Sequence, residues 1–181
     1  MEKLKKLEEI TLPDVRNTCY VLINRETGER KPLSLEDVYK AVESVELHEG
    51  VPDDVRSQFN VARNLAIYTW FCYSFHQVSE LKAFSTLEVA LRVKFGKNKA
   101  GFKRLLTEAV NSGLVKDRGF RHIREGLKET DSTSYVDRLP DIMPRFRNEL
   151  AHGSSMLHPG SFMNLQICGD FINQLFSQAE T

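Results

Sequence analysis

Arginine, asparagine and histidine occur close together near the C-terminal end of the chain, in the stretch "RNELAHG". Arg147 and Asn148 are adjacent, and four residues lie between Arg147 and His152. An imidazole can move a proton, a guanidinium can hold a phosphate through two N–H groups, and an amide can orient an imidazole ring. The set therefore predicts a phosphoryl-transfer site in which His152 is the acid or base, Arg147 stabilises charge on phosphorus and Asn148 is the orienting group.

A short helix must position these residues. Pro140 and Pro144 fit its first turn, and Gly153 fits the left-handed position that ends a helix after His152. A bland alternative follows from the same pattern, because a cationic residue in the last turn of a helix is stabilised by the helix dipole. His152 is then a cap rather than a catalytic group.

The period of an α-helix, about 100° per residue, divides this segment into faces. An apolar group is expected to pack inward, and it consists of Ile142, Met143, Phe146 and Leu150. A polar group shares another face, and it consists of Arg145, Asn148, Glu149 and His152. Arg147 lies roughly 140° from His152 by the same geometry. Since Arg145 shares the face of His152, the pattern leaves open whether Arg145 or Arg147 acts.

The stretch resembles the hallmark of the HEPN superfamily of small all-helical domains. That hallmark is an Arg, usually followed by a polar residue such as Asn, and a His separated from the Arg by four to six residues. Arg147, Asn148 and His152 match this pattern, and Gly153 continues the match. A helix with a Glu ahead of the motif, here "STLEVALRVKFG" with Glu88, is also typical of the group. The resemblance covers roughly residue 53 to the C-terminus.

The resemblance implies a metal-independent endoribonuclease that needs no cofactor. His152 promotes attack by a ribose 2′-hydroxyl on the adjacent phosphate and leaves a cyclic phosphate end, with Arg145 and Glu88 as accessory residues. Such domains usually act as homodimers that bring two motifs together. A role as a toxin or phage-defence effector, with an antitoxin or defence-system partner, is also implied.

Two other functions compete with this one. The first is a non-catalytic HEPN module that dimerises or binds nucleotides in a toxin–antitoxin or defence system. The second is a structural helical protein in which Arg147 pairs with a carboxylate such as Glu88 and His152 caps its helix. The enzyme requires Arg147 and His152 to be exposed in one cleft, whereas the structural protein requires them to be buried or separately paired.

Basic residues are concentrated in one segment of a chain whose formal net charge is zero. Residues 92–128 hold 11 Lys or Arg and three acidic residues, a net charge of +8. This segment predicts a phosphate-binding surface for RNA. The residues expected to contact RNA are Lys97, Lys99, Lys103, Arg104, Arg121, His122 and Arg124. Solvated side chains on a helix face and a loop are the alternative.

No metal site is expected from the remaining histidines. His48, His76, His122 and His158 are scattered and lack Cys or carboxylate companions at ligand spacing. His76 lies in an apolar stretch, which favours a core position. The three cysteines are far apart and support neither a disulfide framework nor a zinc site.

The chain reads as an all-α, HEPN-like bundle over residues 51–181 that follows an N-terminal appendage over residues 1–50. The appendage combines a short strand or hairpin near "CYVLIN" with a helix that begins at Ser34, where Asp37 completes a capping box. Gly50 and Pro52 mark the boundary. Neither a signal peptide nor an uncharged stretch long enough to span a membrane is found, which predicts a cytoplasmic protein.

Residues 53–96 contain no Gly or Pro before Gly96 and predict one very long helix or two helices broken near Ser79 or Ser85. Further helices are expected over residues 100–113 and 161–178, with a long loop over residues 114–139. The uncharged residues 68–75 are expected to form a helix that contributes to a homodimer interface, because a large apolar patch is seldom left in water. The surface bearing the motif is the other candidate interface.

Overall fold

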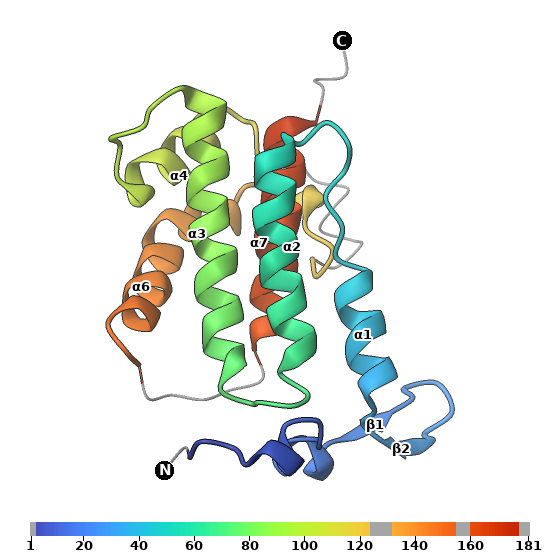
Figure 1. Ribbon diagram of the computed structural model, residues 1–181. Coiled ribbons are helices and arrows are strands. Elements are labelled where there is room, and N and C mark those ends of the chain that lie inside the picture. Colours follow the sequence, from blue (N-terminus) through green and yellow to red (C-terminus); the bar gives the residue numbers. More distant parts are fainter. Residues whose placement is uncertain (1–2, 124–131, 155–159, 178–181) are drawn as a thin grey trace.

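In the computed structural model, which describes residues 3–123, 132–154 and 160–177, a small β-hairpin precedes a group of α-helices (Figure 1). The hairpin pairs β1 (Val21–Ile23) with β2 (Arg30–Pro32) in antiparallel register. The α-helices within the described ranges are α1 (Leu35–Glu43), α2 (Asp53–Tyr68), α3 (Phe75–Phe95), α4 (Phe102–Asn111), α6 (Leu139–Ala151) and α7 (Ser161–Phe176). The expected helical class and the N-terminal hairpin are therefore confirmed. None of the helices described is long and apolar enough to cross a membrane.

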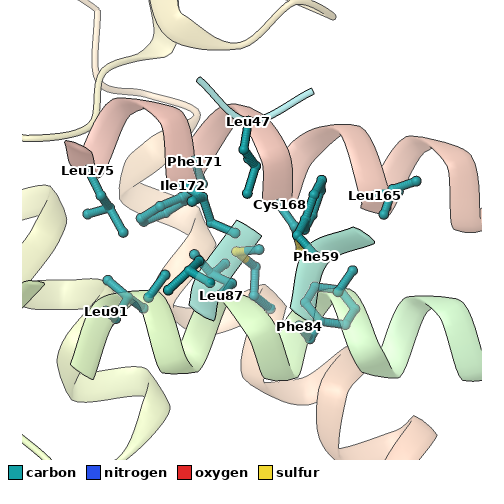
Figure 2. Close-up of a cluster of buried hydrophobic side chains, with 14 of the residues drawn as sticks. Leu47, Phe59, Phe84, Leu87, Leu91, Leu165, Cys168, Phe171, Ile172 and Leu175 are labelled. Atoms are coloured by element: carbon teal, nitrogen blue, oxygen red, sulfur yellow. The ribbon is translucent and has the colours of Figure 1, made fainter. Parts of the chain in front are cut away.

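Helix α3 lies at the centre of the bundle, beside α2 and α7 and with α4 and α6 on its other side (Figure 1). Side chains of α3 and α7 point toward each other in the core, among them Leu87 and Leu91 of α3 and Phe171 and Ile172 of α7 (Figure 2). Each of these four residues is fully buried. Full burial of a side chain of this size contributes about 1.5–3 kcal/mol, so α3 is a fixed support for residues on its outer face.

The beginning of α1 follows the sequence prediction. The hydroxyl of Ser34 accepts a hydrogen bond from the Asp37 backbone N–H, and the Asp37 carboxylate accepts one from the Ser34 N–H. This reciprocal capping box satisfies two donors that a helix start otherwise leaves without partners. At the other end of α1, Val42 and the following Val45 are buried in the same core as α2 and α7.

The break in the long helical stretch was predicted at the wrong place. The chain leaves α2 at Tyr68 and begins α3 at Phe75, so Ser79 and Ser85 both lie inside α3. Ser79 donates its hydroxyl proton to the Ala62 carbonyl of α2 and packs at the helix contact instead of capping a helix. A contact from a distant segment holds the true break, because the Asn17 side-chain amide donates to the carbonyls of Thr69 and Trp70.

Residues 69–74 consequently form a turn rather than part of an uncharged interface helix. The appendage contacts this turn at several points. The Asp14 carboxylate accepts the Tyr73 N–H at 3.0 Å, and the hydroxyls of Tyr20 and Tyr73 lie 2.7 Å apart. Tyr73 is buried, whereas Tyr68 at the end of α2 is exposed. The apolar character of this stretch is thus explained in part by burial within one chain.

The inward face predicted for α6 is only half correct. Met143 is buried and Leu150 packs against the core, but Ile142 and Phe146 are 42% and 48% exposed. Helix α6 packs mainly against α3 and α4, and it also contacts the short 3-10 turn that precedes it. Pro140 lies in the first turn as predicted, whereas Pro144 lies inside the helix.

The segment predicted as a long loop contains two short 3-10 turns, Asp117–Gly119 and Val136–Arg138. Phe120 is fully buried in the core. The buried Asp117 carboxylate accepts the backbone N–H groups of Tyr135 and Val136. These contacts fix the chain immediately before α6, so α6 begins from an anchored position.

Candidate functional site

The end of α6 has the geometry that the sequence predicts. The helix ends at Ala151, His152 is the capping residue, and Gly153 takes a left-handed conformation with φ of +82°. The His152 N–H donates to the Asn148 carbonyl at 2.9 Å. The His152 side chain is exposed, so it can reach a ligand or a second molecule that approaches this end of α6.

Glu88 on α3 holds two arginine side chains at once. Its Oε2 atom accepts from Nη2 of Arg147 at 2.6 Å, and its Oε1 atom accepts from Nη2 of Arg92 at 2.6 Å. The Glu88 side chain is 9% exposed, whereas those of Arg147 and Arg92 are 33% and 37% exposed. The trio carries a formal net charge of +1 and presents part of each guanidinium to solvent, an arrangement suited to an anion.

Asn148 is directed toward Arg147. Its Oδ1 atom accepts from Nη1 of Arg147 at 3.0 Å, so the side chain expected to orient His152 instead helps to fix the arginine. The Nε–H group of Arg147 donates no hydrogen bond to any of the described residues. The guanidinium is therefore held along one part of its edge and keeps further N–H groups available.

Arg147 and His152 point to different sides of α6 within one chain. Arg147 reaches inward to Glu88 on α3, whereas His152 lies on the outward face, as their separation of about 140° requires. Arg145 is exposed on the outward face with His152, and its charge is near enough to Asp141 to help lower the pKa of that carboxyl below its usual value, after the larger effect of Lys103. Among the residues that the structure describes, the groove beside Arg147 is not lined by His152.

A groove of about 1120 Å³ lies beside Arg147. Helix α4 forms one side, α6 forms the other, and Glu88 of α3 lies between them. The polar residues that line it are Glu88, Lys103, Arg104, Thr107, Glu108, Asn111, Ser112, Arg147 and Asn148. His152 is not among the lining residues. The volume lies slightly above the range of about 300–1,000 Å³ that is usual for ligand sites.

Ion pairs reduce the free charge of the predicted RNA-binding segment around α4. Lys97 donates to both carboxylate oxygens of Glu108, at 2.5 and 2.7 Å, and Lys103 donates to Asp141 at 2.6 Å. Lys99 and Arg104 are exposed, and neither has a carboxylate partner within the described ranges. Arg104 is thus the residue of this group that combines a place in the groove with an uncompensated charge.

Arg121 and His122 lie away from this groove. Arg121 is tied to the Asp170 carboxylate of α7 through its backbone N–H at 2.9 Å and its Nε atom at 2.8 Å. His122 packs edge-on against the rings of Phe120 and Tyr135, and burial lowers its pKa from the ordinary value despite the opposing effect of Asp170. The structure does not bring these two residues together with Arg147. Arg124 lies outside the described residues.

His76 and His48 each contact another part of the chain. His76 is buried as expected, with its Nδ1 atom 2.5 Å from the hydroxyl of Ser161. His48 contacts the Asn173 carbonyl through Nε2 at 2.9 Å. His158 is outside the described ranges. In the part of the chain that the structure describes, no three His, Cys, Asp or Glu side chains are placed to hold a metal ion.

Sequence reasoning missed three residues of this region. Arg92 lies one turn after Glu88, a spacing at which an ion pair on one helix is favourable and could have been predicted. Thr107 and Asn111 lie in the groove, where they follow Arg104 at intervals of three and seven residues. That periodicity is visible in the sequence, but it identifies a polar helix face without showing what lies opposite.

No match to the chain is found among protein-family models, curated proteins or solved structures. The geometry described above and the resemblance of the motif are therefore the grounds on which a function can be argued.

Proposed function

We propose that the protein is a metal-independent endoribonuclease of the HEPN type and that it acts as a homodimer. The observation that carries the proposal is the placement of the motif. Arg147 is fixed by Glu88 and Asn148 at the wall of a groove, with N–H groups to spare, and His152 is exposed at the end of the same helix. Transfer of a phosphoryl group from one ribose oxygen to another uses a group that moves a proton and a group that stabilises charge on the phosphate. The accessible imidazole can do the first, and the fixed guanidinium can do the second.

In the proposed reaction, His152 takes the proton from the 2′-hydroxyl of the ribose before the cleaved bond. The 2′-oxygen then forms a bond to phosphorus, and the bond from phosphorus to the 5′-oxygen of the next nucleotide breaks. The departing 5′-oxygen takes a proton from water, and His152 returns the proton it took to the solvent. The products are a 2′,3′-cyclic phosphate and a free 5′-hydroxyl. Arg147 stabilises the negative charge that develops on the phosphate oxygens. The reaction needs no metal or redox partner.

A second copy of the chain resolves the separation between Arg147 and His152. In a two-fold dimer, Arg147 of one protomer can meet His152 of the other, and each dimer then has two equivalent sites. The surface of α6 supports this arrangement, because Ile142 and Phe146 are exposed next to the face that bears His152. Apolar side chains of this size on a helix are typical of a buried contact between protomers.

The biological setting is proposed from the resemblance alone. A toxin or phage-defence effector in the cytoplasm, controlled by an antitoxin or defence-system partner, fits an RNA-cleaving domain of this type. The appendage over residues 1–50 has no assigned role in the reaction.

A non-catalytic binding module is the second candidate, and one observation favours it. Arg147 is ion-paired with Glu88 and faces away from His152 in the single chain. If no second protomer brings a His152 to the groove, Arg147 can bind a nucleotide phosphate without cleaving it. The same ion pair is what a purely structural role requires, and that role differs from both candidates because it involves neither cleavage nor binding.

Cleavage of single-stranded RNA in buffer containing EDTA tests the proposal. Replacement His152→Ala removes proton transfer and should lower the rate by a factor of about 10² to 10⁴. Replacement Arg147→Ala removes charge stabilisation and should lower it by a factor of about 10² to 10³. Because Arg147→Ala leaves Glu88 with one partner, Arg147→Lys is made in parallel to keep a cation at this position.

Two matched controls make the result specific. Arg145→Ala removes the other candidate arginine, and it should leave most of the activity if Arg147 is the acting residue. Arg121→Ala removes an arginine of similar exposure outside the groove and should not change the chemical step. EDTA-resistant cleavage that survives both His152→Ala and Arg147→Ala contradicts the proposal. Binding without any cleavage by the wild type supports the binding module instead.

A further inference from the structure

One face of α4 forms a polar wall of the groove. Arg104, Thr107, Glu108 and Asn111 all line the groove and recur at the spacing that places residues on one side of a helix. The opposite wall carries Arg147 and Asn148 of α6. A ligand that lies along this groove therefore contacts the motif arginine on one side and the α4 residues on the other.

The charges of the groove are not evenly compensated. Glu108 is paired with Lys97, Lys103 with Asp141, and Glu88 with both Arg92 and Arg147. Arg104 lacks a carboxylate partner within the described residues, so the paired groups together with Arg104 leave a positive excess. A second phosphate, in addition to the one at Arg147, can bind at Arg104.

The other two α4 side chains can form hydrogen bonds with a neutral group. The Thr107 hydroxyl donates to the Lys103 carbonyl at 3.0 Å, which leaves its oxygen able to accept. The Asn111 side chain is exposed, and its amide group makes no hydrogen bond to the residues that the structure describes. The donors and the acceptor of this side chain are therefore available. A hydroxyl oxygen that accepts and a side-chain amide that both donates and accepts can pair with the edge of an unpaired nucleobase.

We infer that the groove between α4 and α6 holds one unpaired nucleotide of a single-stranded RNA next to the cleaved phosphate. Arg104 binds the phosphate of that nucleotide, and Asn111 and Thr107 contact the edge of its base. The inference rests on the proposed function for the nature of the ligand, and it adds a preference for particular bases at one position. Duplex RNA does not satisfy the site, because its base edges are already paired.

Binding of RNA that cannot be cleaved tests this inference separately from catalysis. Short 2′-O-methyl oligoribonucleotides labelled with a fluorophore, each with a different base at one position of an otherwise constant sequence, are titrated with the full chain. Wild type should distinguish the four bases at one position. Asn111→Ala should weaken binding of the preferred sequence by a factor of about 5 to 100 and make the four affinities similar.

Matched variants separate the base contact from the phosphate contact. Arg104→Ala should weaken all sequences to a similar extent and lower the slope of log affinity against log salt by about 1. Asn98→Ala and Lys99→Ala alter an exposed amide and an exposed cation just before α4, outside the groove lining, and should leave the base preference unchanged.

Several results overturn the inference. These are wild-type binding without base preference, Asn111→Ala binding that equals Asn98→Ala binding, and absence of RNA binding by the wild type at any salt concentration. The proposed nuclease fails differently, since a wild-type protein that binds with base preference but never cleaves RNA disproves the nuclease and keeps the groove inference. Cleavage that depends on Arg147 and His152 but not on Arg104 or Asn111 supports the nuclease and disproves the groove inference.

Discussion

Two ion pairs in different parts of the bundle each join a partly exposed arginine to a buried carboxylate. Arg147 and Glu88 meet at 2.6 Å, and Arg121 and Asp170 meet at 2.8 Å. The two carboxylate side chains are 9% and 5% exposed. On distance and burial alone the two pairs are alike, yet only one of them lies in a motif that predicts chemistry.

Within the described residues each guanidinium makes two hydrogen bonds, and the difference lies in the partners. Arg121 donates its backbone N–H and its Nε atom to Asp170, and its Nη1 atom donates to the Ser44 carbonyl at 2.6 Å. It therefore connects α7 with the chain after α1 and has a structural role. Arg147 is held by terminal nitrogen atoms only, and its carboxylate is shared with Arg92. The Arg121 clamp joins two segments of the chain, whereas Arg147 is fixed on the wall of a groove and shares its carboxylate with a second arginine.

The largest effect expected from this comparison is on stability. Asp170→Ala removes a buried acceptor of two hydrogen bonds and should lower the free energy of unfolding by about 2–3 kcal/mol. Glu88→Ala should lower it by about 1–2 kcal/mol, since both of its arginine partners can be hydrated once freed. Urea denaturation followed by circular dichroism measures both values.

RNA binding should respond in the opposite order. Glu88→Ala frees Arg147 from its fixed position and should weaken RNA binding in the groove. Asp170→Ala should not weaken RNA binding when the measurement is made without urea, at a temperature at which the variant is folded. Asp170→Asn serves as the milder control, because its amide oxygen can still accept the Arg121 N–H. Equal loss of RNA binding in the two alanine variants would contradict the distinction between clamp and site.

A smaller effect is expected from His122, beside the Arg121 clamp. Burial holds the pKa of His122 below its ordinary value in the folded chain, so the unfolded chain binds a proton more readily. Stability should therefore fall as the pH decreases through about 6.5, the pKa of the unfolded chain. His122→Gln should reduce the dependence of the melting temperature on pH between about 7 and 5. An unchanged pH profile in His122→Gln would show that proton binding by His122 does not contribute to the pH dependence of stability.

Local signals in the sequence were sufficient for the ends of several elements. The capping box at Ser34 and Asp37 and the left-handed Gly153 after α6 follow from residue types over a few positions. The helix expected over residues 100–113 corresponds to α4, which spans Phe102–Asn111. These features depend on hydrogen bonds and burial within one element, which is why a single sequence contains them.

Features that depend on contacts between distant segments were not predictable. The turn between α2 and α3 is held by Asn17 and Asp14 of the appendage, more than fifty residues away in the chain. Phe146 is exposed although the apolar period of α6 placed it on the inward face, because the period does not show how much of that face α3 and α4 cover. The sequence suggests pairing of Arg147 with a carboxylate such as Glu88 as one alternative, but the second arginine on Glu88, Arg92, and the groove beside it depend on the packing of α3, α4 and α6.

A dimer made from two different inactive chains tests the central claim most directly. The claim is that Arg147 of one protomer and His152 of the other form one active site. Arg147→Ala and His152→Ala chains carrying different affinity tags are co-expressed, and the mixed dimer is purified and tested on single-stranded RNA in EDTA. One of its two sites is intact if the sites are shared between protomers, so it should recover about half of the wild-type activity. A mixed dimer no more active than either inactive homodimer would contradict the account.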